Sequence, residues 1–175
     1  MKQYGFISVF LFVTLVCSSQ TQKDIELIRT LFQDIKTGDD AETIISFQIM
    51  ETDEKEISIL NAYKGAAQCM KANYVFSSLS KLKHFNEGKK ILEESIAEYR
   101  NVESVYLRLL IQLNVPKILG YYKEIDGDIL FLQENIASEP IDVTYKNLMI
   151  KNLIGVAKSE EQKNALLQIE LIESS

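Results

Sequence analysis

The sequence predicts an all-α protein, an irregular array or bundle of about seven or eight antiparallel helices. Only seven Gly and two Pro occur among 175 residues, so few residues break helices. Residues that favour helix, such as Leu, Glu, Lys and Ala, are plentiful. Apolar residues recur at spacings of three and four along most of the chain. No β-rich region or long linker appears, so we expect one helical domain over residues 20–175.

The first nineteen residues have the order of a secretory signal peptide. Lys2 gives a short basic region, residues 7–16 form an apolar run, and small polar residues follow as far as Gln20. The apolar run is too short to span a bilayer comfortably, although an N-terminal anchor or a buried helix is the alternative. We therefore expect cleavage near Ser19 or Gln20 and a periplasmic or secreted mature chain without a transmembrane helix.

Cys17 raises a second possibility for the exported chain, a lipid anchor on that cysteine. The usual bacterial lipobox has Gly, Ala or Ser before the cysteine, whereas this chain has Val16. After cleavage only Cys69 remains, so the mature chain cannot form an intramolecular disulfide.

The N-terminal half of the mature chain predicts four helices. Residues 24–36 and the segment after Asp39 and Asp40 are amphipathic, and a longer helix follows the acidic cluster near Glu54. In that longer helix a stripe of small side chains runs beside the apolar stripe, so a neighbouring helix can approach closely. Residues 74–83 are expected to form a linker before the fourth helix. The small stripe contains Ile59, Ala62, Ala66 and Cys69, with Gly65 beside it.

The helix over residues 102–113 is apolar on most of its circumference, which predicts a central position. Arg108 nevertheless stands on it, in line with Ser104 and Gln112. A charge at such a position must be paired or reach water. One interpretation is a structural ion pair, with Glu93, Glu94 or the hydroxyls of Tyr63 and Tyr121 as partners, or a snorkelling side chain. The other is a guanidinium that binds an acid group of a ligand.

Three further helices are predicted after Pro116, which stops the central helix. One contains Ile125, Ile129 and Leu132, the next begins near Glu139 and Pro140, and a capping box at residues 159–162 starts the last. The helix pairs are similar in length to tetratricopeptide-like repeats, although the first-helix pattern of that repeat is absent.

Charge and composition argue against several functions. The net charge of −6 is spread along the chain, which disfavours nucleic acids and anionic membrane surfaces as partners. His84 is the only histidine and has only Cys69 to join it, which argues against a zinc site and makes a His–Cys catalytic pair depend on their meeting in space. Asp126-Gly127-Asp128 is too short for a calcium loop. We expect no metal and no cofactor.

The segments Asn61-Ala62-Tyr63-Lys64-Gly65-Ala66-Ala67 and Tyr106-Leu107-Arg108-Leu109, with Ile111-Gln112, Asn114, Pro116 and Leu119-Gly120-Tyr121, carry a resemblance. They are similar to a family of uncharacterised small exported helical proteins from flavobacteria-like organisms, over roughly the central half of the mature chain. The resemblance implies export and an all-helical fold, and it assigns no catalytic residue.

We expect a non-enzymatic module that binds a protein or peptide in the cell envelope, because helices pair along the chain and no catalytic constellation stands out. The alternative is a protein that binds a small molecule through Arg108 and nearby tyrosines. A third hypothesis, an enzyme with Glu93 or Glu94 paired with Glu98, competes with a solvated polar face. An open pocket around Arg108 would favour the alternative, and an exposed groove between helices the first hypothesis. The candidate binding residues are Arg108, Gln112, Tyr121, Tyr122 and Tyr63.

Overall fold

The structure, a computed structural model, describes residues 22–48 and 53–173. Eight helices and no strand occur within these residues, which confirms the predicted all-α class. The predicted signal peptide and Cys17 lie outside the described residues. In chain order the α-helices are 22–33, Gly38–Ile45 (α2), Glu54–Lys71 (α3), Ser78–Glu98 (α4), Val102–Asn114 (α5), Ile125–Asn135 (α6), Val143–Val156 (α7) and Glu160–Glu173 (α8), with 3-10 turns at Ala72–Tyr74 (η1) and Lys117–Leu119 (η2).

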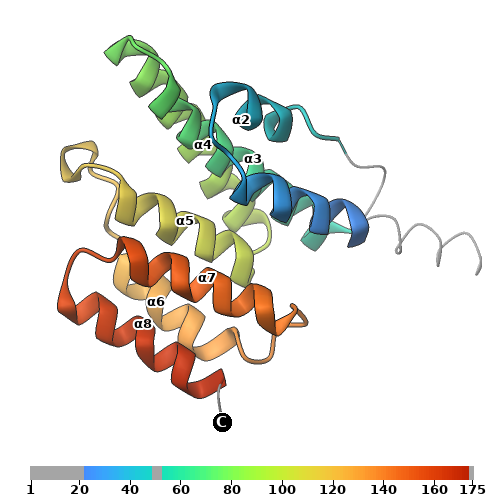
Figure 1. Cartoon of the computed structure of the whole chain (residues 1–175), viewed down its shortest axis with the longest axis vertical. Coiled ribbons are helices and arrows are strands. Elements are labelled where there is room, and N and C mark those ends of the chain that lie inside the picture. Colours follow the sequence, from blue (N-terminus) through green and yellow to red (C-terminus); the bar gives the residue numbers. More distant parts are fainter. Residues whose placement is uncertain (1–21, 49–52, 174–175) are drawn as a thin grey trace, which may run out of the picture.

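The helices are arranged around α5. Figure 1 shows the long α3–α4 pair at the top with the N-terminal helices beside it, and α6, α7 and α8 stacked below α5. α5 packs against α3, α4, α6 and α7, which agrees with the central position expected from its apolar circumference. Within the part of the chain that the structure describes, no helix is both long and apolar enough to cross a membrane.

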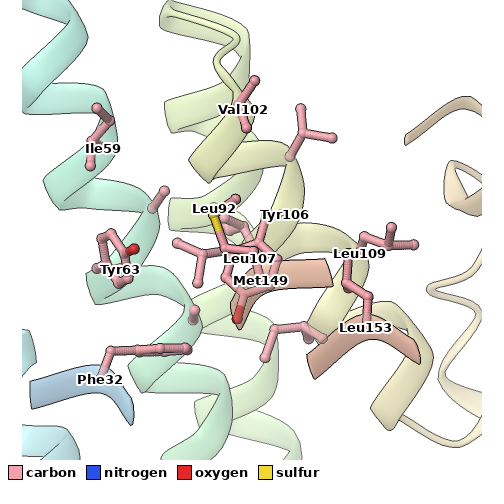
Figure 2. Close-up of a cluster of buried hydrophobic side chains, with 14 of the residues drawn as sticks. Phe32, Ile59, Tyr63, Leu92, Val102, Tyr106, Leu107, Leu109, Met149 and Leu153 are labelled. Carbon is pink, nitrogen blue, oxygen red and sulfur yellow. The ribbon is translucent and has the colours of Figure 1, made fainter. Parts of the chain in front are cut away.

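The core is one contiguous cluster of apolar side chains centred on α5. Leu107 and Leu109 have no exposed surface, and Figure 2 shows Met149 and Leu153 from α7 approaching them. Phe32 from the first helix meets the ring of Tyr63 edge to face, with the ring centres 5.3 Å apart. Each fully buried Leu of this kind contributes about 1.5–3 kcal/mol to folding.

The backbones of α3 and α4 approach each other more closely than side chains at the contact would normally permit. A Cβ atom on Gly65 would lie 2.7 Å from the backbone nitrogen of Leu92, and one on Gly88 would lie 2.5 Å from that of Cys69. The two helices therefore cross backbone to backbone at these glycines. The predicted close approach on the small-residue face is confirmed, and it explains why α3 accepts Gly65 although glycine costs a helix interior about 1 kcal/mol.

Three predicted boundaries were wrong. The first helix, expected over residues 24–36, ends at residue 33. Residues 78–83 belong to α4 rather than to a linker, and the Ser77 hydroxyl caps the helix by accepting a bond from Ser80 N. Leu79 and Leu82 are exposed there. No buried face therefore imposes the helical spacing of apolar residues on this segment, and its sequence did not indicate a helix. α7 begins at Val143 instead of near Pro140, because the Asp142 carboxylate accepts a bond from Thr144 N at 2.8 Å and sets the N-cap.

Candidate functional site

Arg108 forms ion pairs inside the protein. Its Nε donates to Asp128 Oδ2 at 2.8 Å and its Nη2 to Asp128 Oδ1 at 2.5 Å, so Asp128 of α6 is held by two parallel bonds. Its Nη1 donates to Glu93 Oε2 of α4 at 2.9 Å. Arg108 is 6% exposed and Asp128 has no exposed surface. The guanidinium therefore joins α4, α5 and α6, and the structural ion pair is the arrangement observed.

The sequence indicated only part of this partner set. Glu93 was among the expected partners, whereas Glu94 lies on the exposed face and its carboxylate is 3.8 Å from Lys90 Nζ. Asp128 was missed. It lies three residues after Ile125 and four before Leu132, so an acid interrupts the apolar stripe of α6, and that is the signal that could have identified it.

Burial and the partner charges act in opposite directions on the pKa values of Arg108 and Asp128. Burial disfavours the charge on Arg108, but Asp128 and Glu93 outweigh it and hold the pKa of Arg108 above its ordinary value. At Asp128 burial outweighs Arg108, and the pKa of this carboxyl is raised. Burial and Glu93 raise the pKa of Tyr121, so its phenol stays protonated and donates to Glu93 Oε1 at 2.6 Å.

A second buried ion-pair cluster joins the first helix to α5, α3 and α7. Arg29 Nε donates to Glu103 Oε2 at 2.8 Å and Arg29 Nη2 to Glu103 Oε1 at 2.5 Å. Tyr63, which has no exposed surface, donates to Glu103 Oε2 at 2.8 Å and is hydrogen-bonded to the hydroxyl of Tyr145. The candidate Tyr63 therefore lies in this cluster, apart from the Arg108 contacts.

Neither Arg29 nor Glu103 was identified from the sequence. Arg29 lies four residues after Ile25 and three before Phe32, so it also interrupts an apolar stripe. Burial opposes the charge of Arg29, but Glu103 outweighs it and the pKa of Arg29 is raised. Both clusters thus hold charged guanidinium groups whose described partners are the chain's own carboxylates.

Three of the five candidate residues meet at a small cavity, named here the Gln112 cavity. It has a volume of about 210 Å³ and lies where the end of α5 meets η2, the start of α6 and the start of α8. Gln112 is 3% exposed, and neither its Oε1 nor its Nε2 has a hydrogen-bond partner among the described residues. Tyr121 is 5% and Tyr122 49% exposed. The lining residues are Gln112, Leu113, Val115, Lys117, Tyr121, Tyr122, Ile125, Lys158, Ser159 and Gln162.

A larger and more apolar hollow, named here the apolar groove, was not expected at this place. It has a volume of about 590 Å³ and is lined by the end of α3, η1, the start of α4, the end of α5 and η2. The polar side chains that line it, among the residues that the structure describes, are two asparagines, one serine and Lys81. The lining residues are Cys69, Met70, Ala72, Asn73, Ser78, Lys81, Leu82, Phe85, Leu110, Ile111, Asn114, Val115, Pro116 and Leu119.

The two side chains considered for a catalytic pair have other partners. His84 Nδ1 lies 3.2 Å from Gln68 Nε2, and the Cys69 thiol donates to the Phe85 carbonyl at 3.6 Å. Burial raises the pKa of Cys69 to about 12, which keeps it a thiol near neutral pH. Across the described ranges, no three His, Cys, Asp or Glu side chains are grouped so that they could hold a metal ion.

Comparison with protein-family models, with curated proteins and with solved structures found no match for this chain.

Proposed function

We propose that this chain is a non-enzymatic binding module of the cell envelope, and that its apolar groove holds a segment of a partner protein. The observation that carries the proposal is the exposed apolar surface around the groove. Phe76 is fully exposed, Leu79 is 78% exposed and Ile118 is 93% exposed, and each stands close in sequence to a residue that lines the groove. Large exposed apolar side chains close to lining residues of an apolar hollow favour an interaction site there.

The extent of that surface favours a polypeptide over a small molecule. A compound that filled only the groove would leave Phe76, Leu79 and Ile118 in water. An amphipathic helix or an extended segment can fill the groove and cover neighbouring apolar side chains together.

Charge indicates what the partner segment carries. Among the described residues, Lys81 is the only charged one that lines the groove and none that lines it is a carboxylate, although the whole chain has a net charge of −6. An apolar segment with acidic residues at its ends therefore fits better than one with basic ends. The predicted signal peptide supports an envelope location, where such a partner would be met.

The test uses two labelled synthetic peptides of equal length, each with the same leucine-rich helical face, one with glutamates at its ends and one with lysines. Fluorescence anisotropy should show binding of the glutamate-ended peptide. Leu82→Glu should weaken that binding by about tenfold or more, because it places a charge in the groove wall.

The matched control is Leu130→Glu, since Leu130 is 54% exposed on α6 and does not line the groove. This variant should bind the peptide as the wild type does, and Lys81→Glu should reverse the preference between the two peptides. Equal binding by the Leu82→Glu and Leu130→Glu proteins would show that the groove is not the docking site.

A further inference from the structure

Gln112 is an exception among the polar residues of α5. Ser104 shares hydrogen bonds with Asn101, and Arg108 has two acidic partners, yet both side-chain polar atoms of Gln112 are without a partner among the described residues. Buried polar atoms are hydrogen-bonded in the great majority of proteins, because an unsatisfied one loses its bonds to water without replacement. Gln112 lines a cavity, but neither amide atom is open to it, so a group that enters the cavity would meet the amide once the side chain turns towards it.

The amide also defines what that group must offer. Gln112 Nε2 carries two N–H donors and Oε1 is an acceptor, so a complementary ligand presents an acceptor and a donor side by side. An acid group with a hydroxyl on the neighbouring carbon has this arrangement. An acid without the hydroxyl would leave Oε1 unsatisfied.

The charge around the cavity favours an anion. Lys117 and Lys158 line it, and none of the ten lining residues carries a carboxylate. Lys158 Nζ donates to the Val115 carbonyl at 2.9 Å, but an ammonium has three N–H bonds and two are left for a ligand. Ser159 and Tyr122 add hydroxyls at the same cavity.

The volume limits the size of the ligand. A space of about 210 Å³ equals roughly seven water molecules at the volume that each occupies in the liquid. It accepts a compact acid and is too small for a peptide segment or a lipid chain of ordinary length.

We propose that the Gln112 cavity binds a small hydroxy acid, with the acid group and its neighbouring hydroxyl on the Gln112 amide and further negative charge towards Lys117 and Lys158. This site is separate from the apolar groove, with which it shares only Val115 among the lining residues. The proposal therefore does not depend on the peptide-binding function.

The test compares malate with two relatives by isothermal titration calorimetry. Succinate lacks the hydroxyl of malate, and malamide keeps the hydroxyl but lacks the charges. Malate should bind, and both relatives should bind at least about tenfold more weakly, because each leaves part of the site unpaired. Equal binding of malate and succinate would show that the hydroxyl does not bond to Gln112 Oε1. No binding of malate would mean that the cavity holds ordered water only. Either result overturns the proposal.

Gln112→Met is the decisive variant, because methionine keeps the unbranched chain and removes the amide. The free variant should melt at a higher temperature than the wild type, since a buried unsatisfied group is lost, and it should not bind malate. Gln133→Met is the control, because Gln133 Nε2 already donates to the Ala165 carbonyl and its variant should bind malate normally. If the Gln112 variant does not fold, the side-chain amide resonance of Gln112 in the wild type must shift on addition of malate. An unmoved resonance overturns the proposal.

Discussion

The α3–α4 crossing and the ion-pair clusters on α5 hold helices together in opposite ways. At the crossing, Gly65 and Gly88 carry no side chain, so backbone atoms of the two helices meet directly. On α5, Glu103 and Arg108 extend from one helix to a buried Arg29 on one side and a buried Asp128 on the other. Five positions separate Glu103 from Arg108, which is about 140° around a helix, so the two charges reach different neighbours.

This difference separates two sources of specificity. The crossing selects its partner by shape, and any added atom must displace backbone. The clusters select their partners by charge, and removing one member leaves an uncompensated charge in the interior. Substitutions at the crossing should therefore fail through overpacking, and substitutions at α5 should fail through unpaired charge.

The largest effect is expected at Arg108. Arg108→Met should lower the free energy of unfolding by about 3–5 kcal/mol, because it strands Asp128, which has no exposed surface. Arg100→Met should lose less than about 1 kcal/mol, since the Arg100 side chain is 46% exposed and 3.5 Å from Asp128. Urea melts measure both, and Arg108→Met/Asp128→Asn should recover part of the loss. An Arg108→Met protein as stable as the wild type would contradict a structural ion pair.

Gly88→Ala tests the crossing. It should lower the free energy of unfolding by about 3 kcal/mol, because the new Cβ would lie 2.5 Å from both Cys69 N and Gly65 O. Gly155→Ala is the control, since no heavy atom lies within 4 Å of its Cβ position in α7. That variant should gain about 0.5–1 kcal/mol from helix propensity. If urea melts show the same sign for both variants, the backbone contact at the crossing does not exist.

Each ion-pair cluster contains a buried tyrosine that donates a hydrogen bond to a carboxylate, and the loss of that bond should cost more stability in one cluster than in the other. Tyr63→Phe should cost about 2 kcal/mol, because Glu103 is 1% exposed and loses a bond that water cannot replace. Tyr121→Phe should cost less than about 1 kcal/mol, because the Glu93 side chain is 37% exposed and water can take the place of the phenol. Thermal melts of both variants provide the comparison, and the opposite order would mean that Glu93 is the more secluded acid.

Alkaline pH should affect the two regions at different thresholds. Burial raises the pKa of Cys69, beside the crossing, from 9.0 to about 12, and that of Tyr106, on α5, from 10.0 to about 12. Each group has a higher pKa in the folded protein than in the unfolded chain. The full stability is therefore present below the pKa of the unfolded chain, and it is lost as the pH rises towards the pKa of the folded protein. Each group should therefore remove about 1.4 kcal/mol per pH unit, starting near the unfolded value.

Urea melts at a series of alkaline pH values measure these slopes. Cys69→Ala should reduce the loss between pH 9 and 10, and Tyr106→Phe should reduce it only above pH 10. If neither variant changes the slope, these two groups are not secluded from water in the folded protein.

Part of the candidate site was predictable from the sequence for local reasons. Arg108 interrupts an apolar helix, and that alone required a partner, which Glu93 on the preceding helix supplies. Gln112, Tyr121 and Tyr122 do meet at one cavity. Asp128 was missed although the same local signal, a charge within an apolar stripe, was present at its position.

The apolar groove could not be predicted in this way. Leu79 and Leu82 lie on α4, where the sequence suggested a linker, because exposed leucines give no burial period. Its other wall comes from the end of α5 and η2, and no local pattern places those segments opposite the tip of the α3–α4 pair.

The sequence by itself determined the all-α class, the small-residue face of α3 and the need for Arg108 to find a partner, because these follow from helical periodicity and from the cost of burying a charge. The tertiary structure alone decided that Arg108 pairs with Asp128 and Glu103 with Arg29, residues that lie 20 and 74 positions apart in the chain. Helix periodicity fixes which residues share a face, but it carries no information on which helix that face will meet. That choice depends on how all the helices pack at once, and so do the cavity beside Gln112 and the groove beside Lys81.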